Sequence, residues 1–306
     1  MDVIGSLLYK IDLRDLVCFY TELTESSNGI ARGKCPIHHG NNPTSLAIYP
    51  DGTYYCFACH STGNAINFYS AVTGYPFYQA VERLCEEYEV SMDDATFKAQ
   101  KDIVGRNTQM AARFSRYIGH LSDYLMKSRK LTEETIKEFH LGYDGGNFLM
   151  ETPGLIIPIQ DKYARIVGFS KRRLNDGKPK YRNSPDDDIF KKGNILFNYH
   201  RAIGRIKDCG CLHLVEGYMD VMSAHQQGLP CVGYLGSKPT KQQLLILSEL
   251  QKRYPDMVIY LSVDNPKVDK EGRRMLPRIR NDIVKYAPNL NVRCVVFPDG
   301  EDDEKY

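Results

Sequence analysis

Residues 35–59 read CPIHHGNNPTSLAIYPDGTYYCFAC, a stretch that begins and ends with two potential metal ligands. Cys35-x2-His38 and Cys56-x2-Cys59 are spaced as two halves of one tetrahedral zinc site. Four protein ligands leave no coordination position open, and a closed site of this kind stabilises a small domain rather than catalysing a reaction. The sequence therefore predicts a structural zinc site.

The residues between the two pairs predict how the site is held together. Residues 45–49 and 53–57 read as two strands, joined by the turn Pro-Asp-Gly at 50–52. His39 adjoins His38, so either imidazole could be the second ligand, and the spacing favours His38. We expect a zinc-bound hairpin with little hydrophobic core of its own.

The length of 306 residues suits two or three domains. No run of apolar residues approaches the ~18 needed to cross a membrane, and the start lacks the features of a secretion signal, so we expect a cytoplasmic protein without a membrane partner. The pattern changes along the chain predict a zinc-binding domain at 1–92, a linker with some helix at 93–110, a basic subdomain at 111–207 and a C-terminal subdomain at 208–306.

The C-terminal subdomain alternates between strand and helix patterns. Apolar strands are expected at 211–215, 231–235, 257–263 and 292–297, with a helical pattern between each pair. Such alternation is typical of a mainly parallel sheet covered by helices. The overall class predicted is therefore α/β and α+β, in several domains.

Two acidic residues follow strands of this expected sheet. Glu216 comes directly after 211–215 and Asp264 directly after 257–263, so both lie at the carboxyl edge where open α/β sheets bind ligands. Gly217 leaves room for a sharp turn and a ligand. Carboxylate oxygens suit Mg²⁺, although a single Asp at a strand end is commonly only a helix cap. Further acids that could join them are Asp269, Asp299 and Asp302.

Positive charge is concentrated in the middle of the chain. Residues 161–207 hold 13 Lys and Arg against 5 Asp and Glu, a local charge of +8 in a chain whose net charge is +2. Several of these residues fall on a predicted hairpin, where alternate positions share one face. Each could simply be solvated, but together they favour binding of phosphate groups.

Five stretches, taken in order, resemble the bacterial-type (DnaG-like) DNA primases over nearly the whole chain. They are GKCPIHHGNNPTSLAIYPDGTYYCFACHSTGNAINF (33–68), YLMKSRKLTEETIKEFHLGYD (124–144), RIVGFSKRRLNDGKPKYRNSPDDDIFKKGNILFN (165–198), LVEGYMDVMSAHQQGLPCVGYLGS (214–237) and FPDGEDDEKY (297–306). The resemblance implies a zinc ribbon followed by a primase core that ends in a TOPRIM sheet. It also implies synthesis of short RNA primers from nucleoside triphosphates (NTPs) on single-stranded DNA.

The resemblance further implies roles for particular residues. Glu216 and Asp264 would bind catalytic Mg²⁺ or Mn²⁺, with Asp220 in support and Asp269 and Asp302 as further ligands. The positions expected to hold nucleotide phosphates or template are Arg172, Lys180, Tyr181, Asn183 and Lys192.

The chain departs from the family pattern in its acidic motifs. The second motif is usually Asp-x-Asp followed closely by Gly, whereas residues 264–272 read DNPKVDKEG, which makes Asp269 the candidate for the second acid. Residues 299–303 read DGEDD without the usual Pro between the last two acids, and Asp302 is the candidate ligand there. The family's helicase-binding domain has no counterpart in this sequence, so we expect any replicative helicase to be supplied by a separate chain.

Two other functions fit the same residues. A TOPRIM nuclease or topoisomerase-like enzyme would cut strands, and a topoisomerase would also need a nucleophilic tyrosine. A non-catalytic regulator that binds single-stranded DNA would keep the basic region, and its altered acidic motif would have lost the metal. Incubation with NTPs and single-stranded DNA separates these functions, because only a primase produces oligoribonucleotides.

Overall fold

The computed structural model describes residues 2–26, 29–92, 95–263 and 270–295, with the backbone only at 270–273. The chain divides into two compact units, Met1–Ile103 and Val104–Tyr306. Asp264, Asp269 and Asp302, which the sequence predicts as metal ligands, lie outside the described residues. None of the described helices is both long enough and apolar enough to span a bilayer.

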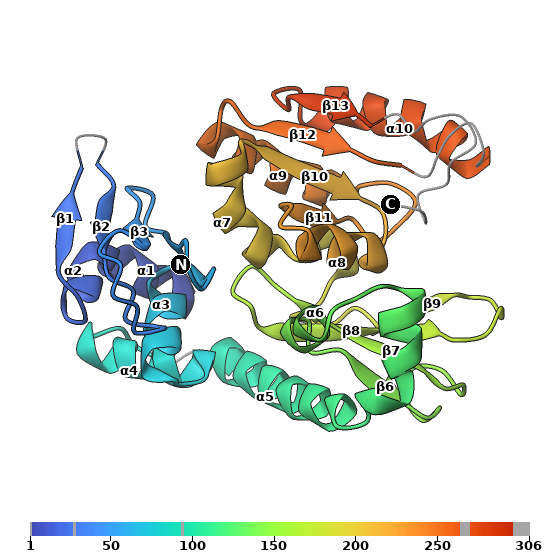
Figure 1. Cartoon of the computed structure of the whole chain (residues 1–306), viewed down its shortest axis with the longest axis horizontal. Helices are drawn as coiled ribbons and strands as arrows, with labels where there is room; N and C mark the ends of the chain where they lie inside the picture. The colour runs from blue at the N-terminus through green and yellow to red at the C-terminus, as the bar shows by residue number, and fades with distance from the viewer. Residues whose placement is uncertain (1, 27–28, 93–94, 264–269, 296–306) are drawn as a thin grey trace. The chain divides into compact units, whose positions relative to one another are not determined.

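The first unit is built around a five-stranded antiparallel sheet in the order β1-β2-β3-β4-β5 (Figure 1). Its strands are β1 (Leu23–Glu25), β2 (Ala31–Gly33), β3 (Leu46–Ile48), β4 (Tyr54–Cys56) and β5 (Thr62–Gly63). The predicted hairpin is confirmed as β3 and β4, and its turn is closed by the N–H of Tyr49, which donates to the carbonyl of Thr53 at 2.9 Å. Gly52 takes a φ of +74°, a conformation that favours glycine.

Four helices accompany this sheet: α1 (Val3–Lys10), α2 (Leu13–Cys18), α3 (Ala65–Thr73) and α4 (Phe77–Glu87). Asp2 and Asp12 cap α1 and α2, since each carboxylate accepts a hydrogen bond from a backbone N–H of the first turn. The helices bury Leu7, Phe68 and Leu84, each with 0% of its surface exposed. The ring of Tyr54 on the hairpin packs against Phe68 of α3 with centroids 5.4 Å apart, so the helices complete the hydrophobic core of the hairpin.

Residues predicted as a linker with some helix form most of α5 (Ala95–Ser115). The buried residues Phe97, Val104 and Ala111 recur every seven positions, which places them on one side of the helix. Most of the other positions of the helix are polar, which weakens the helical pattern in the sequence. The boundary between the two units falls within this helix, between Ile103 and Val104.

The second unit begins with short helical segments and an antiparallel sheet in the order β6-β7-β8-β9. The helical segments are η1 (Ile118–Leu121), η2 (Tyr124–Ser128), α6 (Glu133–Glu138) and η3 (Lys192–Asn194). The strands are β6 (Gly142–Asp144), β7 (Gly154–Gln160), β8 (Ile166–Arg173) and β9 (Tyr181–Asn183). Every residue of β7 is buried, because one face packs on α5 and the other on a second core.

The predicted parallel sheet is confirmed at the C-terminal end, with the order β11-β10-β12-β13 and every pairing parallel (Figure 1). The strands are β10 (Cys211–Val215), β11 (Cys231–Gly233), β12 (Val258–Leu261) and β13 (Val292–Cys294). The helices are α7 (Tyr199–Cys209), α8 (Tyr218–Gln226), α9 (Lys241–Arg253) and α10 (Lys270–Tyr286), which continues through Pro277.

The parallel sheet buries two different cores. One core packs the sheet against α7, α9 and α10 and includes Leu212 and Leu214. The other core includes Val215 of β10, Val221 of α8 and Leu155 of β7, so it is shared with the antiparallel sheet. This shared core joins the two sheets of the second unit.

A polar cluster reinforces the same junction. Glu138 of α6 accepts from Nε2 of His225 on α8 at 2.9 Å and pairs with Arg201 of α7 at 3.1 Å. Beside it, Nδ1 of His200 is buried without a hydrogen-bond partner, and burial lowers the pKa of this imidazole well below its usual value. The positive charge of Arg201 lowers it further. His200 is therefore neutral in the folded protein.

The neutral state of His200 predicts a loss of stability in mild acid. Below about pH 6.5 the unfolded chain binds a proton at this position and the folded chain does not, so the free energy of unfolding should fall by up to about 1.4 kcal/mol per pH unit. Between pH 7 and 5.5, the free energy of unfolding measured with urea should fall less for His200→Gln than for the wild type. His120→Gln, at an exposed histidine, is the control and should follow the wild type.

Candidate functional site

The structure brings Cys35, His38, Cys56 and Cys59 together, with one ligand atom from each within 4.8 Å of the others. The Sγ atoms of Cys35 and Cys59 are 3.9 Å apart, and Sγ of Cys56 is 3.7 Å from Nδ1 of His38. A tetrahedral zinc ion with 2.3 Å bonds to sulfur sets its sulfur ligands about 3.8 Å apart. These two separations match the spacing of ligands around a zinc ion.

The local backbone explains this geometry. The backbone N–H of Cys59 points at Sγ of Cys56 at 3.4 Å, a contact that favours a thiolate. A Cβ atom at Gly40 would lie 2.2 Å from Nε2 of His38, so glycine makes room for the imidazole. His39 is exposed, takes a φ of +53° and is not part of the cluster.

Burial affects the protonation of the thiols at this site. Burial raises the pKa of Cys35 to about 12 and raises that of Cys59, so both would stay protonated without a cation. A zinc ion displaces these protons and stabilises the thiolates. Among the described residues, these four form the one cluster of Cys, His, Asp and Glu able to hold a metal ion.

The carboxyl edge of the parallel sheet carries Glu216, which follows β10 directly and is half-buried. Gly217 begins α8, and its N–H donates to a carboxylate oxygen of Asp220 at 3.1 Å. A Cβ atom at Gly217 would lie 2.5 Å from that oxygen, so glycine leaves room for the carboxylate in this position. Asp220 therefore supports the start of α8 beside Glu216.

The adjacent strand ends at the same edge. Leu214 of β10 pairs with Leu261 of β12, and the N–H of Ser262 donates to the carbonyl of Leu214 at 3.0 Å. The described chain continues to Val263, immediately before Asp264. The carboxyl edge of the parallel sheet, where Glu216 lies, is called here the acidic edge. The described residues around it have the strand arrangement that the sequence predicts.

One face of β8 and β9 lies against α8 and is called here the inner face, made of Arg172, Tyr181 and Asn183. Asn183 accepts a hydrogen bond from the hydroxyl of Tyr218 at 2.6 Å. The rings of Tyr181 and Tyr218 have centroids 5.4 Å apart. Since Tyr218 is two residues from Glu216, the inner face adjoins the acidic edge.

Arg172 is the charged residue at the centre of the inner face. Only 5% of its surface is exposed, and its Nε has no hydrogen-bond partner. Its guanidinium lies 5.6 Å from the ring centroid of Tyr124 and 5.5 Å from that of Tyr181. Among the described residues, no carboxylate pairs with Arg172. A buried cation without an anion is suited to an anionic ligand.

Tyr181 of the inner face and Tyr218 of α8 both keep their hydroxyl protons. Burial raises the pKa of Tyr181 to about 12 and raises that of Tyr218 further above its usual value. A tyrosine nucleophile needs a lowered pKa or an adjacent base. These two residues are therefore poor candidates for the nucleophile of a topoisomerase.

Sequence reasoning missed Arg129, which the structure places beside the inner face. Its Nε donates to the hydroxyl of Tyr124 at 3.0 Å, and its guanidinium lies 5.5 Å from the ring centroid of that tyrosine. The residue lies in the stretch 124–144 that resembles the family, but it falls outside the charge-rich middle of the chain, so the sequence gave no further signal for it.

Lys171, by contrast, belongs to the basic run but is unavailable to a ligand. Its side chain is 0% exposed, and its ammonium contacts Asp144 and donates to the carbonyls of Phe148 and Met150 at 3.0 Å each. Burial would raise the pKa of Asp144, but Lys171 and the N–H groups of Gly146 and Phe148 outweigh burial and lower it. This pair fixes the loop between β6 and β7.

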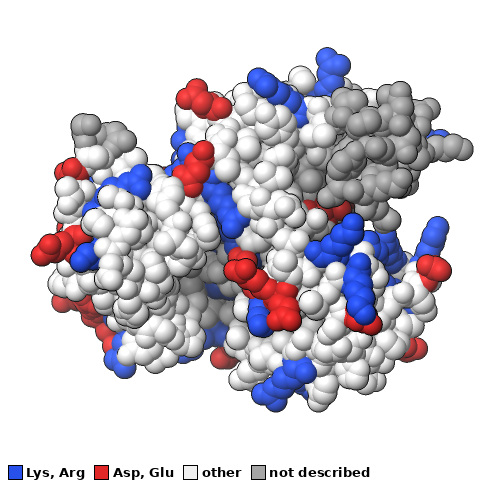
Figure 2. All heavy atoms as spheres, in the orientation of Figure 1, with Lys and Arg blue, Asp and Glu red and all other residues white. Residues whose placement is uncertain are grey.

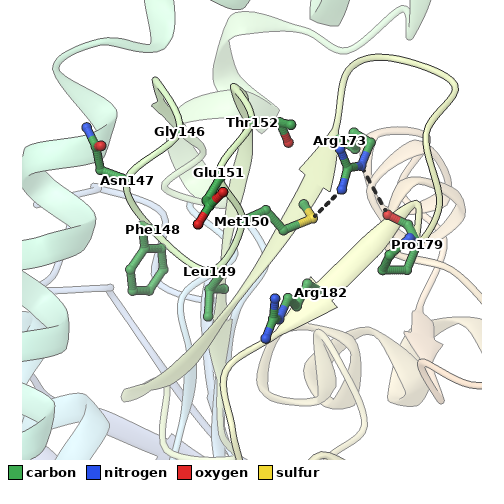
Figure 3. Close-up of a pocket in the computed structure, with 10 residues that line it drawn as sticks. All are labelled: Gly146, Asn147, Phe148, Leu149, Met150, Glu151, Thr152, Arg173, Pro179 and Arg182. Carbon is green, nitrogen blue, oxygen red and sulfur yellow. Dashed lines mark hydrogen bonds between the residues drawn. The ribbon is translucent and has the colours of Figure 1, made fainter.

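The opposite, outer face of β8 and β9 carries Arg173 and Arg182, which line a pocket of about 750 Å³ with the loop at 146–152 (Figure 3). Figure 3 shows the Arg173 guanidinium between the sulfur of Met150 and the carbonyl of Pro179. Neither arginine forms an ion pair with another described residue. The basic residues of β8 and β9 therefore lie on both faces of the antiparallel sheet.

The remaining predicted contacts, Lys180 and Lys192, are at the surface. Lys180 precedes β9 and is exposed, while Lys192 begins η3 and is half-buried. The N–H of Lys192 donates to Asp186 at 3.2 Å. Among the described residues, neither side chain bonds to Arg172 or Tyr181. Figure 2 shows Lys and Arg side chains gathered over the side of the second unit that carries β9.

Known proteins similar to this chain share its order of parts. A DNA primase of Clostridium acetobutylicum is 28% identical over 347 aligned residues, covering 100% of this chain and 56% of that protein. The crystal structure of the zinc-binding and RNA polymerase domains of the Aquifex aeolicus primase matches with a TM-score of 0.61 and 25% identity, covering 100% of this chain and 81% of that one. The structure of a DnaG primase catalytic domain bound to single-stranded DNA matches with a TM-score of 0.54 and 23% identity, covering 68% and 75%. The chain spans about half the length of the curated relatives it matches.

Three family models match in succession. They are the CHC2 zinc finger at 1–100, the N-terminal domain of the DNA primase catalytic core at 152–203 and a Toprim-like domain at 213–306. A zinc ribbon, a basic sheet and a Toprim-like sheet therefore follow one another in this chain. In this order of parts, and in relatives whose alignments cover the whole chain, the protein is similar to the bacterial DnaG-type DNA primases.

The zinc site predicts different effects for two adjacent histidines. His38→Ala should reduce bound zinc, measured by elemental analysis, from about one ion per chain to a small fraction, because the shell loses one of four ligands. His39→Ala is the matched control and should retain the ion. Zinc loss from His39→Ala with retention in His38→Ala would reassign the ligand.

Proposed function

We propose that this chain is a DNA primase, a DNA-directed RNA polymerase that makes short RNA primers from NTPs on single-stranded DNA. The observation that carries the proposal is the hydrogen bond between Tyr218 and Asn183, at 2.6 Å. It joins a face with a buried, unpaired cation to the sheet edge that carries Glu216. Nucleotidyl transfer needs both parts within the length of one triphosphate.

In the proposed reaction, the 3′-hydroxyl of one nucleotide attacks the α-phosphorus of another. A new P–O bond forms, the bond to the β-phosphate oxygen breaks, and pyrophosphate leaves. No side chain has to act as a nucleophile, so the protein contributes position and charge. Arg172 and Arg129 would hold phosphate oxygens of the incoming nucleotide.

The Toprim-like domain implies a divalent cation, and carboxylate oxygen is the donor that Mg²⁺ and Mn²⁺ prefer. Glu216 is the described donor, and we assign Asp264, Asp269 and Asp302 as further ligands. When bound, the cation would neutralise charge on the triphosphate. Asp220 would keep Glu216 in place by fixing the start of α8.

The template would be single-stranded DNA, which is also what the structural relative noted above binds. We assign the outer-face pocket to template phosphates, with Lys180 and Lys192 as further contacts at the surface. The zinc unit would help to select the start sequence or steady the first dinucleotide. A primase acts on cellular DNA, so we place the protein in the cytoplasm, with any replicative helicase supplied by a separate chain.

The proposed domains keep the limits expected from the sequence: a zinc-binding domain at 1–92, a connecting segment at 93–110, a basic subdomain at 111–207 and a Toprim subdomain at 208–306. The connecting segment is mostly helical. The shared core of the last two subdomains supports a single catalytic body.

Glu216→Gln tests the proposed reaction. Primer synthesis from labelled NTPs on single-stranded templates should fall by at least about 100-fold, because neutralising the carboxylate weakens electrostatic stabilisation of the transition state. Glu249→Gln, at an exposed glutamate of α9, is the control and should leave synthesis unchanged. Cleaved template in place of RNA would indicate a nuclease. Binding of DNA without any metal-dependent product would indicate a regulator.

The outer-face pocket predicts a change in the salt dependence of DNA binding. Arg173→Gln and Arg182→Gln together should lower the slope of log affinity against log salt by about 1.4, because each lost contact with a single strand removes about 0.7. Fluorescence anisotropy with a labelled oligonucleotide measures this slope. Lys252→Gln is the control, since Lys252 lies at the end of α9 away from the acidic edge. An unchanged slope would remove the pocket from the template path.

A further inference from the structure

Tyr124 stands at the start of an unusual turn. Residues Tyr124–Ser128 form the π-helix η2, and the N–H of Arg129 donates to the carbonyl of Tyr124, five residues earlier, at 3.0 Å. A π-turn holds one more residue than an α-turn and is often found at functional sites. Here it allows the side chain of Arg129 to return to the ring of Tyr124, at 5.5 Å from its centroid.

The hydroxyl of Tyr124 has two donors from different segments. Nη1 of Arg172 on β8 donates to it at 2.8 Å, and Nε of Arg129 donates at 3.0 Å. A phenolic oxygen can accept two hydrogen bonds, and its own proton remains available to a third group. The same ring also lies 5.6 Å from the Arg172 guanidinium. One half-buried tyrosine thus contacts two cations separated by 43 positions in the sequence.

The hydroxyl of Tyr124 gives Arg172 a neutral hydrogen-bond partner. Arg172 is 5% exposed, its Nε has no partner, and no carboxylate among the described residues pairs with it. Hydrogen bonds to a neutral hydroxyl orient a guanidinium without cancelling its charge. The tyrosine therefore holds Arg172 in a fixed direction while its charge stays available to an anion.

We propose that Tyr124 is a positioning residue that orients Arg172 and Arg129 for the phosphates of a nucleoside triphosphate, and that it acts through its hydroxyl. The proposal rests on the proposed primase function and deepens it. A purely structural tyrosine is the competing role, because Tyr124 also packs against the core shared by the two sheets. The two roles differ in what the hydroxyl contributes, since packing needs only the ring.

Tyr124→Phe removes the hydroxyl and keeps the ring. The KM for NTPs in primer synthesis should rise about 10-fold to 100-fold, because Arg172 loses an acceptor and its orientation. The kcat should change far less, since Glu216 and the reacting atoms are untouched. Titration with ATP and Mg²⁺ by calorimetry should show a matching loss of affinity.

Tyr143→Phe is the matched control. Tyr143 packs against the same core, and its hydroxyl makes no hydrogen bond with another described residue. This variant should keep the wild-type KM. The double variant Tyr124→Phe with Arg172→Lys should lose less affinity than the sum of the two single variants, because the tyrosine acts partly through Arg172.

The outcomes for Tyr124→Phe and for the wild type distinguish failure of this inference from failure of the proposed function. If the wild type synthesises primers and Tyr124→Phe keeps its KM within twofold, the positioning role is wrong and the primase function stands. The same conclusion holds if Tyr124→Phe only lowers the melting temperature, with KM unchanged where it is folded. If the wild type neither binds ATP nor makes RNA, the primase function itself fails.

Discussion

The hydrogen bond from Tyr218 to Asn183 joins α8, the helix that follows strand β10 of the parallel sheet, to strand β9 of the antiparallel sheet. Around it, the rings of Tyr181 and Tyr218 pack together, and the core beneath them is shared by both sheets. Because a buried core resists independent movement, this contact holds the cationic inner face at a fixed place beside Glu216. A reaction that depends on position and charge needs this rigidity.

The two faces of β8 and β9 divide the basic residues by physical role. Arg172, on the inner face, is buried and lacks a counterion, so its charge is strong and directional. Arg173 and Arg182, on the outer face, line an open pocket where water screens them, which suits a strand that must move. Lys171 directly precedes Arg172 in the sequence but is paired with Asp144, so it fixes the loop between β6 and β7 instead of adding charge to either face.

Local patterns in the sequence predicted much of the site. The zinc ligands follow from spacing within two short turns, and the placement of Glu216 follows from strand periodicity and the parallel sheet. The structure confirms the strands around both. Neither Arg129 nor the burial of Lys171 could be predicted, because the first depends on a π-turn and the second on a partner 27 positions away. The short strands β1, β2 and β5 carry too few residues for an alternation to be recognised.

A crystal structure of the protein soaked with an NTP and Mn²⁺ tests most directly the proposed joint action of the inner face and the sheet edge that carries Glu216. Anomalous scattering should place a manganese ion within bonding distance of the Glu216 carboxylate, with the phosphates of the same nucleotide on Arg172. Manganese remote from Glu216, or a nucleotide held away from Arg172, would contradict the proposed polymerase site.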